Sequence, residues 1–426
     1  MNERLAFRTG LLRQLLVASA VASAACGDSG SGSGAGGSGG GGETASGGGG
    51  ETASGGGGET ASGGGGAAAG GQGGEGGQGA AGGGNAGGQG GMAGAGGSSG
   101  SGMNGVERCF FGVPPCPPAA EAVTVFGSCT DQLELVTEWI SGPTEVNGTC
   151  CYQVNVTAPN AGECAAIGRP FMVENQARVA PLRVGDRRWK AAGLAPDLSS
   201  LSPELRAQLG REWAHDAAYE HASIASFGKL ALELLVFGAP ADLIERTHRA
   251  AADEIRHAQA GFALASSYLG QPVGPSTLPE AARLVLAGSL EELAAAAVRE
   301  GCCGETLAAL VADAQRDAAT DPVVREVLTR IAAEEAEHAA LAYSVVAWAI
   351  ATGGDSVRTA AHRAFIESTH DLEQACANAE QSEALSHNEA LRAHGRLSAK
   401  EALRERLRGM REVVAPAMAQ LLGEAS

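Results

Sequence analysis

The stretch DEIRHAQAG, from Asp253 to Gly261, places Glu254 and His257 three residues apart among small apolar residues. Apolar residues recur around it at steps of three and four, which is typical of the buried face of an α-helix. Glu254 and His257 both fall within that apolar stripe. A buried carboxylate or imidazole costs free energy unless it has a partner. The stretch therefore predicts a helix that brings polar side chains inside to meet one.

The spacing Glu-x-x-His occurs five times in the chain, so the spacing alone is a weak signal. The pairs are Glu212/His215, Glu245/His248, Glu254/His257, Glu335/His338 and Glu367/His370. A solvated helix face explains any one of them. Only the pairs that begin at Glu254 and Glu335 lie within apolar stripes and match each other in the two halves of the helical region.

Helix signals divide the chain after residue 200 into two hairpins and a tail. Ser202 before Pro203 marks one helix start, and Ser398 with Glu401 forms a capping box. The predicted helices span 203–237, 240–269, 289–318, 322–352, 356–386 and 399–422. A Pro/Gly-rich crossover, GQPVGPSTLP, joins the hairpins. We therefore expect a mainly α fold, with a four-helix bundle at 202–352 and extra C-terminal helices within 355–426.

Counting from the two hairpin turns places six polar side chains at one level. Glu220 precedes the turn near residue 239 by 19 residues, and Glu254 and His257 follow it by 15 and 18. In the second hairpin a Glu precedes the turn near residue 320 by 20 residues, and a Glu and a His follow it by 15 and 18. Antiparallel helices rise equally per residue, so these side chains should meet. The expected cluster is Glu220, Glu254, His257, Glu300, Glu335 and His338.

Four buried carboxylates would repel one another and take up protons if no positive charge lay among them. Two divalent cations supply four positive charges, and neutral imidazoles bind metals alongside carboxylates. The cluster therefore predicts a site for two metal ions.

This ligand set resembles that of the ferritin-like superfamily of di-iron carboxylate proteins, which includes rubrerythrin. The resemblance covers about 202–352. It implies that Glu220 and Glu300 are terminal ligands, that Glu254 and Glu335 bridge, and that His257 and His338 each bind one metal. Iron is the family's usual metal, and manganese suits the same ligands.

The resemblance implies chemistry with oxygen, peroxide or ferrous iron. The chain lacks the Cys-x-x-Cys pairs of rubrerythrin, and the extra helices and a tethered N-terminal part oppose assembly into a storage cage. We expect a redox protein whose electron donor and oligomeric state the sequence leaves open. The competing hypothesis is a non-catalytic surface lipoprotein with a metal-free structural bundle and a partner-binding β domain.

Residues beside the expected ligands are assigned simpler roles. Cys303 lies on the apolar seam and is expected to be an inert thiol, while Cys302 either stays buried or pairs with Cys376. Glu305 lies well off the direction of Glu300, so we expect it at the surface or behind the ligands. Tyr343 flanks the expected site, and we do not expect it to act as a redox relay.

The N-terminus has the pattern of a bacterial export signal at residues 1–25. A basic start precedes the short apolar run LLVASAVASAAC, and Cys26 then opens a Gly/Ser-rich tract. We expect a lipid on Cys26 and a membrane-anchored, exported protein. Ser23 stands where Leu or Val is usual, so plain secretion after ordinary cleavage is the alternative. Residues 26–105 predict a disordered tether, because Gly and Ser cannot offset the entropy of folding.

Residues 106–189 predict a small β domain with disulfides. CYQVNVT, from Cys151 to Thr157, alternates apolar and polar residues as a strand does. Dense cysteines favour an oxidising compartment, and the absence of any Cys-x-x-Cys pair argues against zinc. The disulfide candidates are Cys109, Cys116, Cys129, Cys150, Cys151 and Cys164, with the adjacent pair going to different partners. The net charge of −18 disfavours a nucleic-acid partner.

Overall fold

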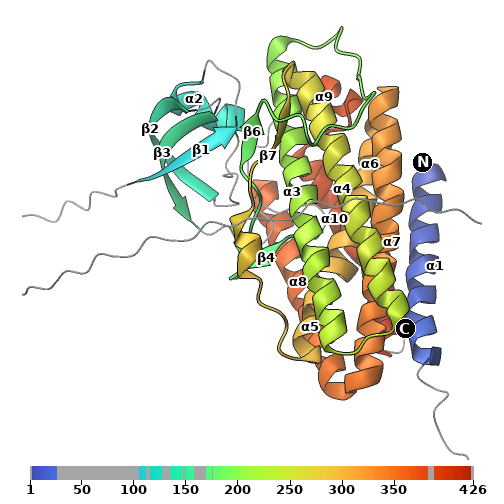
Figure 1. Ribbon diagram of the computed structural model, residues 1–426. Coiled ribbons are helices and arrows are strands. Elements are labelled where there is room, and N and C mark those ends of the chain that lie inside the picture. Colours follow the sequence, from blue (N-terminus) through green and yellow to red (C-terminus); the bar gives the residue numbers. More distant parts are fainter. Residues whose placement is uncertain are drawn as a thin grey trace, which may run out of the picture. The chain divides into compact units, whose positions relative to one another are not determined.

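The computed structural model describes residues 2–25, 105–111, 116–126, 135–146, 149–157, 169–174, 176–381 and 388–423. Within these residues the chain is mainly helical and has a small disulfide-bonded strand region (Figure 1). Nearly all of the expected tether, with Cys26, lies outside the described residues, as do Cys129 and Cys164.

The strand region is a three-stranded antiparallel sheet in the order β1-β3-β2. The strands are β1 (Val106–Phe111), β2 (Leu135–Val146) and β3 (Thr149–Thr157), and α2 (Ala119–Phe126) contacts β2. Strand β3 contains the predicted alternating stretch, and its inward residues Tyr152 and Val154 are buried with Phe110. The prediction of a strand at 151–157 is confirmed.

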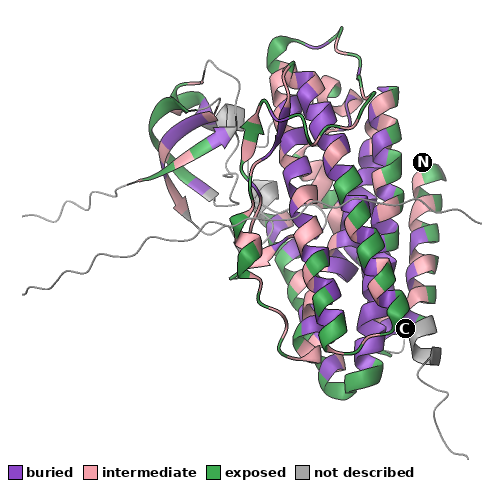
Figure 2. Cartoon of the chain, viewed as in Figure 1, coloured by how far each residue is buried: buried purple, intermediate pink, exposed green. Residues whose placement is uncertain are grey.

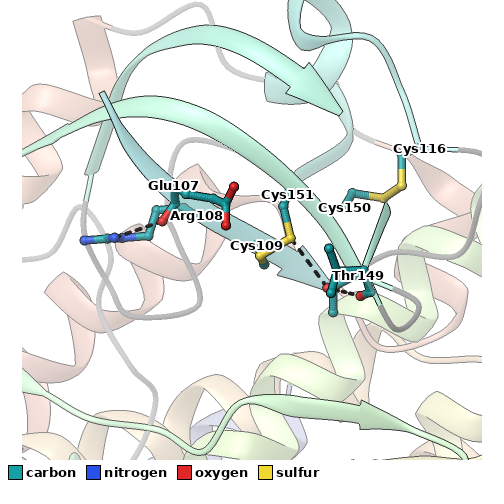
Figure 3. Close-up of a disulfide and its surroundings, with 8 residues drawn as sticks. Glu107, Arg108, Cys109, Cys116, Thr149, Cys150 and Cys151 are labelled. Atoms are coloured by element: carbon teal, nitrogen blue, oxygen red, sulfur yellow. Dashed lines mark hydrogen bonds between the residues drawn. A yellow bond between two sulfur atoms is a disulfide. The ribbon is translucent and has the colours of Figure 1, made fainter. Parts of the chain in front are cut away.

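The described residues of the strand region contain two disulfides. Cys109 on β1 is bonded to Cys151 on β3, and Cys116 is bonded to Cys150 (Figure 3). The two adjacent cysteines therefore have different partners, as predicted. Disulfides persist in oxidising compartments, so they indicate an exported environment.

The segment that begins at Arg169 packs with the helices, because the hydroxyls of Ser223 and Ser226 donate to the carbonyls of Arg169 and Pro170. Short strands β4 (Met172–Val173) and β5 (Gln176–Ala177) pair with each other. Strand β6 (Leu182–Val184) pairs with β7 (Val273–Pro275), which lies in the crossover between the helical hairpins. Long-range pairing of this kind leaves no local sequence signal.

The long helices begin and end close to the predicted residues. They are α3 (Pro203–Val236), α4 (Ala241–Leu269), α5 (Leu290–Ala296), α6 (Thr306–Ala318) and α7 (Pro322–Gly353). A 3₁₀ turn, η1 (Pro279–Arg283), lies in the crossover. Ser202 caps α3 through the amide of Leu205, and Asp321 caps α7. Between α5 and α6 lies a π-helical segment, η2 (Ala297–Glu305), where one unbroken helix was expected.

Each of these helices carries buried residues along part of its length, and these residues form the core (Figure 2). One cluster contains Leu209, Trp213 and Phe262 with partly buried residues of the segment before α3, and another contains Phe227 and Tyr343. Helix α3 packs along α4, and α7 contacts α4, α6 and η2. Side chains of α3, α4, η2 and α7 can therefore share one interior.

The C-terminal part is helical, as predicted. It contains α8 (Asp355–Gln381), α9 (Glu389–Ala393), α10 (Ala399–Gly409), the π-helical η3 (Met410–Val414) and α11 (Ala415–Leu422). Ser398 and Glu401 form the predicted capping box at the start of α10.

Residues read from the sequence as an export signal form α1 (Asn2–Ala25), which contacts α7 and α11 (Figure 1). Leu11 and Leu15 are buried, and Arg8 forms an ion pair with Glu405. The role of residues 1–25 in export stays a prediction. Within the described part of the chain, no helix combines the length and apolar composition that crossing a membrane requires.

Candidate metal centre

Among the described residues, two groups of buried or partly buried carboxylates and imidazoles lie in the helical region, and each group could hold a metal ion. In each, the ligand atoms lie within 4.8 Å of one another. The first group is Glu220, Glu254, His257 and Glu335, and the second is Glu254, Glu305, Glu335 and His338. Helices α3, α4 and α7 and segment η2 each contribute at least one of these side chains.

Glu254 and Glu335 belong to both groups, so each offers carboxylate oxygens to both. Both are about 1% exposed. Nδ1 of His338 lies 3.2 Å from Oε1 of Glu254, and Nδ1 of His257 lies 3.4 Å from Oε1 of Glu335. Each imidazole thus faces the bridging carboxylate of the other helix.

The structure brings together five of the six predicted ligands and replaces the sixth. Glu300 belongs to neither group, and its carboxylate forms an ion pair of 3.2 Å with buried Arg169. Glu305 takes the expected place of Glu300. Glu305 is fully buried, so it does not lie at the surface, and its carboxylate belongs to the second group, so it does not lie behind the ligands.

The π-helical segment η2 explains the exchange. On a regular α-helix, residues five apart point about 140° away from each other. In π-helical geometry hydrogen bonds join residues five apart, so Glu300 and Glu305 lie much closer to one face. Glu305 then lies 15 residues before the turn near residue 320, and Glu335 lies 15 after it. The equal distance of Glu305 and Glu335 from the turn could have identified Glu305 from the sequence. Assuming a regular α-helix hid it, because Glu305 then points away from Glu300.

The Nε2 atom of each imidazole contacts a carboxylate of the other helix. Nε2 of His257 on α4 lies 2.7 Å from Glu334 on α7. Nε2 of His338 on α7 lies 3.3 Å from Asp253 on α4. A proton on Nε2 that is donated to the carboxylate leaves the Nδ1 lone pair facing the centre, and this is the tautomer that binds a metal. Both Asp253 and Glu334 directly precede a ligand glutamate, and the sequence analysis missed them.

Several ligand atoms are buried without a hydrogen-bond partner, which tests whether the residues fit a metal. They are Oε2 of Glu254, Nδ1 of His257, both carboxylate oxygens of Glu305, Oε2 of Glu335 and Nδ1 of His338. Buried polar atoms are nearly always satisfied, because leaving one unpaired costs about 1–3 kcal/mol. Oxygen and imidazole nitrogen around a common point suit a divalent ion such as iron or manganese. The residues therefore fit a divalent metal ion.

The electrostatics of the cluster favour positive charge at its centre. Burial raises the pKa of Glu220 well above its ordinary value, and burial with Glu335 does the same for Glu305. Burial opposes charge on His338, but Glu254 and Glu335 outweigh it and raise its pKa to about 10. Without a cation, protons bound to Glu220, Glu305 and His338 reduce the negative charge of the cluster. A bound metal would displace them.

No protein-family model, curated protein or solved structure matches the chain. A function must therefore be inferred from the arrangement of the candidate ligand atoms.

The cysteines near the centre are thiols. Cys302 and Cys303 are buried outside any disulfide, so the alternative in which Cys302 pairs with Cys376 is wrong. Burial raises the pKa of Cys303 to about 12, which keeps it protonated and weakly reactive. Tyr343 is fully buried and belongs to the hydrophobic core.

Proposed function

We propose that this protein is an exported, ferritin-like metal protein whose centre holds two metal ions. The observation that carries the proposal is the pair of buried ligand groups that share Glu254 and Glu335. Four carboxylates, from Glu220, Glu254, Glu305 and Glu335, balance two divalent cations, and one histidine serves each group.

Iron is the proposed metal, with manganese as the alternative that the same ligands accept. Bound iron would supply reversible one-electron chemistry between the ferrous and ferric states. The chain would use this chemistry on oxygen, peroxide or ferrous iron. Its own residues would hold the ions at a fixed place, orient the imidazoles through Asp253 and Glu334, and exclude bulk water.

The proposed location follows from the disulfides and the N-terminal pattern. The bonds Cys109–Cys151 and Cys116–Cys150 fit an oxidising compartment. We propose that the chain is exported through residues 1–25 and anchored to the membrane by a lipid on Cys26. Mass spectrometry of the membrane fraction tests this directly, because lipidation predicts a mature N-terminus at Cys26 that carries acyl chains.

Metal analysis of the purified chain tests the centre. The proposal predicts about two ions per chain after anaerobic loading with ferrous iron, and loss of both ions in Glu254→Ala and Glu335→Ala. Glu326→Ala is the control, because Glu326 lies on α7 but is 74% exposed. A metal-free chain whose melting temperature is unchanged in the two ligand variants would instead favour a structural bundle. Aerobic oxidation of ferrous iron and consumption of peroxide then separate the reactions.

A further inference from the structure

A small pocket beside α3 reaches the metal centre from the side of the first ligand group. Trp213, Asp216, Glu220 and His257 line it, and its volume is about 30 Å³. A water molecule needs roughly 10–15 Å³ by this measure, so the pocket admits a small ion or water and no organic substrate.

Three carboxylates at intervals of four residues lead along α3 toward the centre. They belong to Glu212, Asp216 and Glu220, and each step along the helix is about 6 Å. Their side chains are 32%, 24% and 14% exposed, so exposure falls toward the centre. Glu220 is itself a member of the first ligand group.

Arg396 lies across the two outer carboxylates. Its Nε is 2.7 Å from Glu212, and its Nη1 is 2.5 Å from Asp216. Its guanidinium carbon lies 5.3 Å from the ring centre of Trp213, which lines the pocket. The side chain is 11% exposed and places one positive charge between the two outer carboxylates, so it balances half of their negative charge.

The inner end of the pocket presents an unsatisfied ligand atom. Nδ1 of His257 is buried without a hydrogen-bond partner, and the residue lines the pocket. Its Nε2 is occupied by Glu334, so the free lone pair faces the interior. The pocket therefore brings Asp216 and Glu220, the two inner carboxylates of the row, together with the unpaired Nδ1 of His257.

We propose that divalent cations reach the centre along Glu212, Asp216 and Glu220, and that Arg396 is the barrier that limits their entrance. This inference rests on the proposed metal centre. A cation must displace the guanidinium from Glu212 and Asp216 before these carboxylates can attract it. Once Arg396 has moved, a lining of one charge sign concentrates cations and speeds their arrival.

Stopped-flow loading of the metal-free chain with cobalt alone tests the route, with cobalt absorbance as the readout. Arg396→Gln should load about tenfold faster, because the barrier charge is gone. Asp216→Asn should load several-fold more slowly, because the route loses a carboxylate while Glu212 still holds Arg396. Neither residue is a ligand, so the final amount of cobalt should stay at about two ions per chain in both variants.

Arg249→Gln and Glu245→Gln are the controls, because this exposed pair on α4 lies outside the pocket. They should load at the wild-type rate. Normal cobalt content with unchanged rates in both Arg396→Gln and Asp216→Asn would overturn the route and leave the centre standing. Absence of bound cobalt in the wild-type chain would overturn the centre and the route together. Circular dichroism identifies a variant that has lost its fold, and if Arg396→Gln has lost it, the rate in Asp216→Asn decides the test.

Discussion

At the scale of single residues, Glu305 gives the most informative test of the proposed metal centre. Glu300 and Glu305 lie on the same π-helical segment, but only Glu305 belongs to a ligand group. We expect Glu305→Gln to lose one of the two metal ions or to bind it at least tenfold more weakly. Glu300→Gln should keep both ions. Calorimetric titration with ferrous iron under anaerobic conditions measures this, and metal loss in the Glu300 variant alone would show that the original sequence prediction was right.

The carboxylates behind the imidazoles give a second prediction at this scale. Glu334→Gln removes the charged partner of Nε2 of His257, which lies 2.7 Å away. Loss of such a partner typically weakens metal binding by about 10–100-fold. Asp253→Asn should weaken the other ion by a smaller factor within that range, because its contact with His338 is longer, at 3.3 Å. Equal affinity in Glu334→Gln and in the exposed control Glu326→Gln would contradict this role.

At the scale of the element, segment η2 packs unusually close to α7. A Cβ added at Gly301 would lie 2.3 Å from Cβ of Ala342, so the two backbones approach where only glycine fits. We expect Gly301→Ala to destabilise the chain by about 1–3 kcal/mol. Gly228→Ala on α3 is the matched control, because nothing lies within 4 Å of its added Cβ. It should stabilise the chain by up to about 1 kcal/mol through helix propensity. Urea unfolding measures both, and a neutral Gly301→Ala would contradict the close packing.

The elements also show how far the sequence could be read. The starts of α3, α7 and α10 were predictable, because Ser202, Asp321 and Ser398 cap their own helices through neighbouring amides. The π-helical turn was not, because apolar periodicity does not reveal one inserted residue, and this misplaced the ligand at Glu305. Contacts between distant segments, such as β6 with β7 or Arg396 with Asp216, depend on tertiary packing and have no local pattern.

At the scale of the whole molecule, the cluster predicts how stability depends on pH. In the metal-free chain the folded-state pKa of Glu220 and of Glu305 lies well above 4.5, and that of His338 is about 10 against 6.5. Between pH 6.5 and about 10 the folded state therefore binds more protons than the unfolded state. The free energy of unfolding falls as pH rises through this window. The histidine part is fully present below pH 6.5 and is lost as pH approaches about 10.

Thermal melts of the metal-free chain between pH 6.5 and 10 measure this trend. The melting temperature should fall across the range, and His338→Gln should reduce the fall. Metal-loaded chain should show a smaller decline, because cations replace the protons. A melting temperature that rises with pH in the metal-free chain would contradict the assigned charges.

The most direct measurement is anomalous X-ray diffraction from crystals of the iron-loaded chain. Two peaks are expected, one among Glu220, Glu254, His257 and Glu335, and the other among Glu254, Glu305, Glu335 and His338. Glu254 and Glu335 should contact both. No anomalous peak among these residues, or a single peak beside Glu300, would contradict the dinuclear centre.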